Sequence, residues 1–140
     1  YETFDEEIAK AGGIDVMLIG LGFDGHFCSN CPRCTPMDAL TYARARHVTV
    51  EANPNYPNNT ARPYSITMGP ASLMKVKHLV LIVNGKHKAE IFKKFLTEPI
   101  SEELPATILR LHPNFTVIAD EDAASLLSEE DLRGPVKKLD

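Results

Sequence analysis

Three short and nearly continuous apolar runs constrain the fold of this chain most strongly. They occupy residues 14–19, 79–83 and 115–119. A run of this length without alternation fits a strand that is covered on both faces, as in a parallel sheet. Residues 47–50 alternate between polar and apolar instead, and they predict a further, weaker strand.

Helical patterns lie between and after these runs, at residues 2–11, 69–74, 86–96, 105–111 and 120–127. The last of these helices is predicted from Asp120, because an aspartate side chain can cap a helix N-terminus. An Asn- and Pro-rich stretch at residues 53–63 predicts a surface loop. The order of strands and helices indicates an α/β layered domain.

Composition excludes several classes of protein. The formal net charge of -4 argues against a nucleic-acid-binding protein, which needs a basic face. No apolar run approaches the roughly 20 residues of a membrane span. The acidic start lacks the basic and apolar regions of a signal peptide, so we expect a cytoplasmic protein. The chain also lacks an initiator Met, and we expect it to be a fragment.

The segment at residues 20–34 follows the first apolar run and permits three interpretations. In the first, Gly20, Gly22 and Gly25 match the G-x-G-x-x-G fingerprint of dinucleotide-binding proteins, with Glu51 as an acid for the ribose. That motif must open a helix, whereas prolines follow here and no apolar helical stripe is present. The dinucleotide interpretation is therefore weak.

The second interpretation is a metal site. Cys28, Cys31 and Cys34 are spaced C-x₂-C-x₂-C, and His26 supplies a fourth ligand. Zinc sites usually draw ligand pairs from separate segments, and an iron–sulfur run of this kind needs a fourth cysteine. We therefore prefer the simpler interpretation that the three cysteines are free thiols in a buried turn, as is usual in a reducing compartment.

The third interpretation is an acid–base site. His26 can exchange protons near neutral pH, and Asp24, two residues earlier, can orient its imidazole. The structural alternative is that Asp24 caps the turn and His26 only packs. The residues by themselves support both equally.

A second feature favours chemistry. The segment at residues 84–88 joins the second apolar run to an amphipathic helix and includes Lys88. Free backbone N–H groups at a helix start favour an anion, although a solvated helix start with no ligand fits the same pattern. An acid–base turn and an anion turn at strand ends of one sheet together indicate a phosphorylated substrate.

At these residues the sequence resembles the glucosamine-6-phosphate deaminase and 6-phosphogluconolactonase superfamily. The matching motifs are Gly12-Gly13-Ile14-Asp15, Gly20-x-Gly22-x-Asp24-Gly25-His26, Thr67-Met68-Gly69, Gly85-x-x-Lys88-Ala89, Pro105-Ala106-x-x-Leu109-x-Leu111-His112-Pro113 and Val117-Ile118-x-Asp120-x-x-Ala123-Ala124. The resemblance implies a Rossmann-like three-layer α/β fold with a mainly parallel sheet, of which only the later strands are present. Residues 1–140 then form the C-terminal part of a single domain, with residues 128–140 as a peripheral tail.

The resemblance also assigns roles to residues. It makes His26 the catalytic proton-transfer group, Asp24 its orienting partner, and Gly20, Gly22 and Lys88 substrate-binding residues, with Lys88 on the phosphate. It implies no cofactor, no metal, no nucleic-acid or membrane partner, and it is compatible with a homo-oligomer. Five further matching residues are expected to be structural: Thr67, Met68, Leu109, His112 and Pro113.

Two departures from the family pattern bear on the reaction. In deaminases a Glu follows the Asn of this turn, whereas here Cys31 follows Asn30, so the roles of both residues stay open. The family's earlier half, with its phosphate loop and a second proton-carrying Asp, has no counterpart in the chain. We expect the intact protein to be an isomerase or deaminase that acts on a hexosamine 6-phosphate. The motif also resembles that of deaminase-like relatives linked to galactosamine 6-phosphate. A lactone hydrolase of the 6-phosphogluconolactonase type and an inactive sugar-phosphate-binding module are the alternatives.

Overall fold

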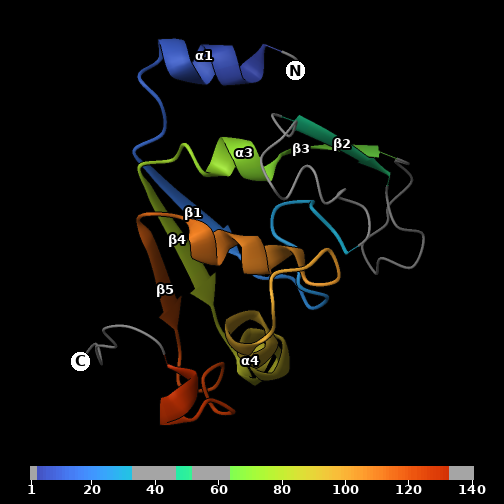
Figure 1. Cartoon of the computed structure of the whole chain (residues 1–140), viewed down its shortest axis with the longest axis vertical. Coiled ribbons are helices and arrows are strands. Elements are labelled where there is room, and N and C mark those ends of the chain that lie inside the picture. Colours follow the sequence, from blue (N-terminus) through green and yellow to red (C-terminus); the bar gives the residue numbers. More distant parts are fainter. Residues whose placement is uncertain (1–2, 33–46, 52–63, 133–140) are drawn as a thin grey trace.

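The main sheet has three parallel strands, as the apolar runs predict. The computed structural model describes residues 3–32, 47–51 and 64–132. Strand β1 (Val16–Gly20) pairs with β4 (His78–Val83), which pairs with β5 (Phe115–Ala119), in the order β1-β4-β5. Figure 1 shows the three strands running in the same direction, with β4 in the middle. An α/β fold with a mainly parallel sheet is therefore confirmed.

A second, two-stranded sheet is separate from the first. Strand β2 (His47–Glu51) pairs with β3 (Tyr64–Met68) in the antiparallel direction. The strand at residues 47–50 is thus confirmed, whereas β3 was not predicted. The predicted loop at residues 53–63 lies outside the described residues.

Short helices connect and cover the strands. They are α1 (Phe4–Lys10), α3 (Pro70–Leu73), the 3₁₀ turn η1 (Lys86–Lys88), α4 (Ala89–Thr97), and the 3₁₀ helices η2 (Pro105–Leu111) and η3 (Glu129–Asp131). Both α3 and η2 begin with proline, which is preorganised for a first helical turn. Helix α4 buries Ala89, Phe92 and Phe95 on one side, as its apolar stripe predicts.

The helix predicted at residues 120–127 is wrong. The carboxylate of Asp120 does accept a hydrogen bond from the Ala123 N–H, at 2.8 Å, as a capping residue would. Beyond it, one bond of α-helical spacing forms, from the Ala124 N–H to the Asp120 carbonyl, and the segment continues in turns. The cap is present, but the helix does not propagate.

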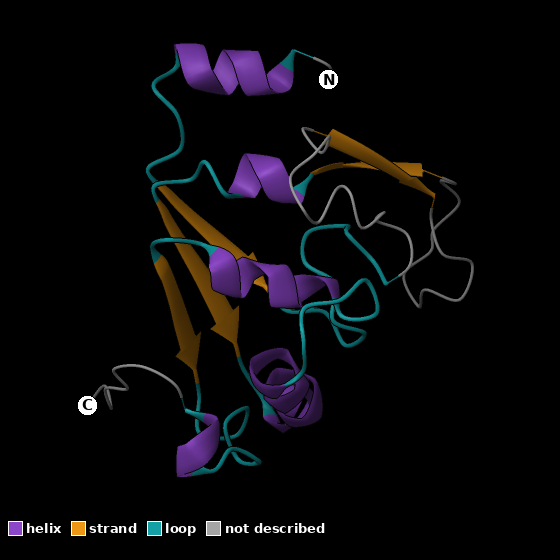
Figure 2. Ribbon diagram, in the orientation of Figure 1, coloured by secondary structure: helices purple, strands orange, loops and turns teal. Residues whose placement is uncertain are grey.

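The hydrophobic core lies between one face of the main sheet and the layer formed by α3, η2 and α4, which Figure 2 shows in purple beside the orange strands. Its largest fully buried apolar side chains are Phe27, Phe95, Leu73, Leu79, Leu81 and Leu109. The other face of β1 is exposed, since Val16 and Leu18 are 57% and 63% accessible. The expectation that this strand is covered on both faces is therefore wrong within the described part of the chain.

The beginning of the predicted tail contacts the body of the protein. In η3 the Asp131 carboxylate lies 3.5 Å from the Nζ of Lys93 on α4. Residues 133–140 lie outside the described residues. Among the helices of the described segments, none is long and apolar enough to cross a membrane.

A leucine-to-alanine substitution is expected to lower the free energy of unfolding by different amounts on the two faces of the sheet. Leu81 is fully buried and Leu18 is mostly exposed, on adjacent strands. Leu81→Ala is expected to lower the free energy of unfolding by about 2–5 kcal/mol, because it leaves a cavity in the core. Leu18→Ala should change it by about 0.5 kcal/mol or less. Urea unfolding of both variants measures the difference, and equal losses would show that the second face is covered in solution.

Candidate active site

The residues expected to carry chemistry gather at one edge of the main sheet. Because β1, β4 and β5 are parallel, their carboxyl ends meet there. The loop at residues 21–32 follows β1, the turn at residues 84–88 follows β4, and Asp120 follows β5. Ligands in open α/β sheets bind at this edge. The two turns that indicated a phosphorylated substrate are thus neighbours in space.

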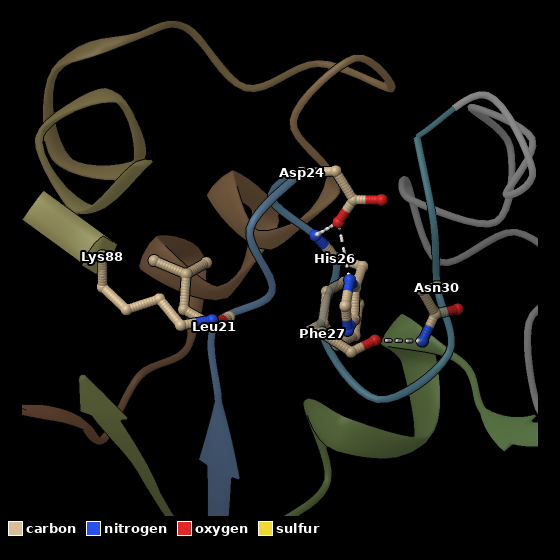
Figure 3. Close-up of polar contacts among 6 residues, drawn as sticks. All are labelled: Leu21, Asp24, His26, Phe27, Asn30 and Lys88. Atoms are coloured by element: carbon tan, nitrogen blue, oxygen red, sulfur yellow. Dashed lines mark hydrogen bonds and ion pairs between the residues drawn. The ribbon is translucent and has the colours of Figure 1, made fainter. Parts of the chain in front are cut away.

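Asp24 and His26 form a hydrogen-bonded pair. Oδ1 of Asp24 lies 2.6 Å from Nδ1 of the imidazole and accepts the backbone N–H of His26 at 3.2 Å. Figure 3 shows both contacts converging on one carboxylate oxygen. With Nδ1–H donating to the carboxylate, Nε2 becomes the nitrogen that exchanges protons. The side chain of His26 is 21% accessible and that of Asp24 is 37% accessible, so a ligand in solution can reach them.

Gly22 makes room for this imidazole. A Cβ atom at Gly22 would lie 1.9 Å from Nδ1 of His26, a distance that no packed structure tolerates. The Gly22 N–H also donates to the His26 carbonyl at 2.8 Å. Gly22 thus supports the position of His26, and its expected contact with substrate stays a prediction. Gly20 differs, since it is exposed and a Cβ there would meet no atom within 4 Å.

Lys88 is joined to the same turn from a distant part of the chain. Its Nζ donates to the Leu21 carbonyl at 2.5 Å, the contact visible at the left of Figure 3. The ammonium also lies 3.8 Å from the ring centroid of Phe23, a cation–π contact. Burial lowers the pKa of Lys88, and the negative charge of Asp24 partly offsets this by raising it. The lysine and the Asp24–His26 pair are therefore electrostatically coupled.

Phe23 is a residue that the sequence analysis missed. It is 65% exposed, large and apolar, and its ring also lies 5.4 Å from the imidazole of His87. The sequence signal that could have identified Phe23 is its place between Gly22 and Gly25 of the motif. Phe23 links the loop after β1 to the turn after β4.

One of the backbone N–H groups after β4 that were expected to favour an anion is already used within the protein. The Gly85 N–H donates to both carboxylate oxygens of Asp120, at 3.0 and 2.9 Å. Gly85 has φ +86°, a backbone conformation that residues other than glycine rarely adopt. The Gly85 N–H is therefore paired with a carboxylate of the protein itself. Lys88, in the same turn, is the predicted phosphate ligand, and this role stays a prediction.

Asn30 has a structural position. It is fully buried, and its Nδ2 donates to the carbonyls of Met68 at 2.9 Å and Phe27 at 3.3 Å. The hydroxyl of Thr67 accepts the backbone N–H of Ser29 at 3.0 Å. These contacts tie the loop after β1 to β3. Thr67 is structural, as expected.

The cysteines differ from the expectation of free thiols in a buried turn. Cys28 is free but exposed, and desolvation of its sulfur raises its pKa above the ordinary value. Cys31 is buried and takes part in a disulfide rather than carrying a free thiol. Cys34 lies outside the described residues.

The dinucleotide interpretation of the segment loses support. The glycines after β1 lead into a loop through residue 32 and not into a helix, so the dinucleotide fingerprint is wrong (Figure 2). Within residues 3–32, 47–51 and 64–132, no group of three or more His, Cys, Asp or Glu side chains could hold a metal.

His112 is a packed turn residue, as expected. It is 5% exposed, its Nε2 lies 2.9 Å from the Val76 carbonyl, and its Nδ1 accepts the Asn114 N–H at 3.0 Å.

The coupling between Asp24 and Lys88 predicts a pKa change. Asp24→Asn removes a negative charge that favours the ammonium form, so the pKa of Lys88 should fall further. Asp15→Asn is the matched control, because Asp15 pairs with Lys77 near the amino end of β1. NMR titration of Lys Cε resonances measures both variants. An unchanged Lys88 pKa in Asp24→Asn would show that the two groups are not coupled.

Comparisons with known proteins identify the family of the chain. The family model described as glucosamine-6-phosphate isomerases/6-phosphogluconolactonase matches residues 2–118. The chain is 39% identical over 132 residues to the glucosamine-6-phosphate deaminase of Thermoanaerobacter pseudethanolicus, covering 93% of the chain and 52% of that protein. It is 42% identical to the deaminase of Shouchella clausii, covering 91% and 53%. The chain thus spans about half the length of these curated relatives.

Solved structures give the same result. A monomeric glucosamine-6-phosphate deaminase superposes with a TM-score of 0.71 at 32% identity, over 90% of this chain and 53% of that one. The 6-phosphogluconolactonase of Trypanosoma brucei superposes with a TM-score of 0.66 over 91% of this chain and 52% of its own, and at 19% identity it supports the fold alone. The chain therefore belongs to the glucosamine-6-phosphate isomerase/6-phosphogluconolactonase family.

Proposed function

We propose that a complete domain containing this chain catalyses aldose–ketose isomerisation, coupled to ammonia release, of a hexosamine 6-phosphate. The observation that carries the proposal is the contact between Lys88 and the Leu21 carbonyl, which places a cation beside the Asp24–His26 pair. A phosphorylated sugar offers the two groups that this edge suits, an anion and a proton-bearing hydroxyl. The curated relatives that carry the name glucosamine-6-phosphate deaminase support the same reaction.

His26 opens the sugar ring in this proposal. Nε2 takes the proton of the O1 hydroxyl as the C1–O5 bond breaks, and the same proton is returned to O5, so that an open-chain aldehyde forms. Asp24 holds the imidazole through Nδ1 and stabilises its charged form during the transfer. The step needs only acid–base groups, so the proposal includes no cofactor and no metal.

Lys88 binds the phosphate. Its present acceptor, the Leu21 carbonyl, is neutral, and a phosphate oxygen is a stronger acceptor for an ammonium group. Gly20, exposed at the end of β1, lines the sugar. Gly22 acts indirectly, by leaving space for the imidazole.

The later proton transfer between sugar carbons needs a second acid–base group. The family resemblance assigns it to the half of the fold that this chain does not span. Residues 1–140 are accordingly proposed as the C-terminal part of one domain, inactive by itself, with residues 128–140 peripheral. We also propose a cytoplasmic location. The free thiol of Cys28 favours this location, whereas the disulfide at Cys31 is more usual in an oxidising compartment.

Turnover of a completed domain tests the reaction. This chain, joined to the first half of the Shouchella clausii deaminase, is assayed with glucosamine and galactosamine 6-phosphates while ammonia and ketose phosphate are followed together. Release of both products is expected. Acid release from 6-phosphogluconolactone without ammonia would replace the proposal with lactone hydrolysis, and binding without either turnover would replace it with a sugar-phosphate-binding module.

Variants of the completed domain test the two main roles. His26→Ala should lower kcat by about 100-fold to 10,000-fold, because it removes the proton carrier. Lys88→Ala should mainly raise KM, by roughly 10-fold to 100-fold, through loss of a charged hydrogen bond. His78→Ala, at the amino end of β4, and the exposed Lys86→Ala are matched controls that should leave both constants unchanged. A wild-type kcat in His26→Ala would contradict the mechanism.

A further inference from the structure

An exposed aromatic side chain lies at the edge of the candidate site. Phe23 is 65% exposed, so its ring contributes little to the hydrophobic core. The Nζ of Lys88 lies over this ring, 3.8 Å from its centroid, and the His87 imidazole lies 5.4 Å away, centroid to centroid. Both contacts join the loop after β1 to the turn after β4. Burial of apolar surface does not explain why a phenylalanine stands at this position.

The turn after β4 is shaped so that His87 can reach the ring. A Cβ atom at Gly85 would lie 2.7 Å from Cε1 of the His87 imidazole, so another residue at position 85 would have to displace it. The imidazole lies against the turn and packs on Phe23 with an angle of 44° between the two planes. His87 therefore supports the Phe23 ring while Lys88 lies over its face.

The ammonium group of Lys88 keeps donors available for a ligand. An ammonium has three N–H donors, and the Leu21 carbonyl accepts one of them. The Phe23 ring attracts the positive charge through its π face. Among the residues that the structure describes, no carboxylate forms an ion pair with Lys88. An anion can therefore bind to Lys88 while both present contacts are kept.

The contact with Phe23 also limits the motion of Lys88. A lysine side chain is long and flexible, and fixing it in one position when a ligand binds costs conformational entropy. The Leu21 carbonyl and the Phe23 ring hold the ammonium from two directions before any ligand arrives. Phe23 directly precedes Asp24 in the chain, so the same loop holds the cation and carries the acid–base pair.

We propose that Phe23 is a positioning residue, whose ring holds the Lys88 ammonium ready for the phosphate group of the substrate. The proposal rests on the phosphate-binding role proposed for Lys88 above, and it makes an aromatic side chain part of that role. Phe23 acts through Lys88 and need not touch the sugar or the phosphate. Because its ring is mostly exposed, its replacement is expected to leave the fold intact.

Phosphate binding by the completed domain tests this role. Phe23→Leu keeps an apolar side chain but removes the π face, whereas Phe23→Tyr keeps an aromatic ring. Inorganic phosphate is titrated into each variant while the NMR resonance of the Lys88 Cε group is followed. Phe23→Leu is expected to weaken phosphate binding by about twofold to fivefold, through loss of the cation–π contact. Phe23→Tyr should bind phosphate as the wild type does.

Phe4→Leu is the matched control. It makes the same change at a phenylalanine that is 47% exposed on α1, at the other end of the main sheet from α4 (Figure 1), and should leave phosphate binding unchanged. Kinetics separates positioning from a general structural role. In Phe23→Leu the KM for the hexosamine 6-phosphate should rise by a factor similar to the loss of phosphate binding, while kcat changes by less than about twofold.

Four outcomes would overturn the proposal. The first two are a wild-type domain whose Lys88 does not respond to phosphate, and unchanged phosphate binding in Phe23→Leu. The third is tighter binding in Phe23→Leu, which would mean that Lys88 must leave the ring to reach phosphate. The fourth is equal weakening in Phe23→Leu and Phe23→Tyr. Phosphate binding is measured without turnover, so the expected binding changes in a domain that releases no ketose phosphate would contradict the proposed reaction and leave the role of Phe23 intact.

Discussion

The parallel pairing of β1 with β4 is the constraint on which the rest of the structure depends. Its register, from Val16 beside His78 to Gly20 beside Ile82, places the carboxyl ends of both strands at one edge. Lys88 can therefore reach the Leu21 carbonyl although 67 positions separate them in the sequence. The same pairing buries Leu79 and Leu81 against the helices, so the core and the candidate site are set by one arrangement.

Continuous apolar runs made the main sheet predictable, because a central strand in a parallel sheet has little freedom in composition. Strand β3 was not predicted, although Tyr64-Ser65-Ile66-Thr67-Met68 alternates apolar and polar residues with the period of a strand. The helix expected after Asp120 was wrong for a different reason. Its acidic first residues read as a helix start, whereas the Asp120 carboxylate also binds the Gly85 N–H 35 positions away.

The site could be located from the sequence, but its internal contacts could not. The spacing of Asp24 and His26 suggested a pair, since two residues across a glycine can face one another. The function of Gly22 depends on where the His26 ring lies, and a motif does not contain that position. The cation–π contact of Phe23 joins segments from two strand ends, and it exists only once β1 and β4 are paired.

The exposed apolar side of β1 and the candidate site lie on the same strand. Val16 and Leu18 lie on the exposed face, while the strand ends at Gly20, directly before the loop that carries Asp24 and His26. A partner strand that pairs in parallel with β1 must bring its own carboxyl end to the same edge. A second acid–base group carried just after such a strand would then lie close to His26.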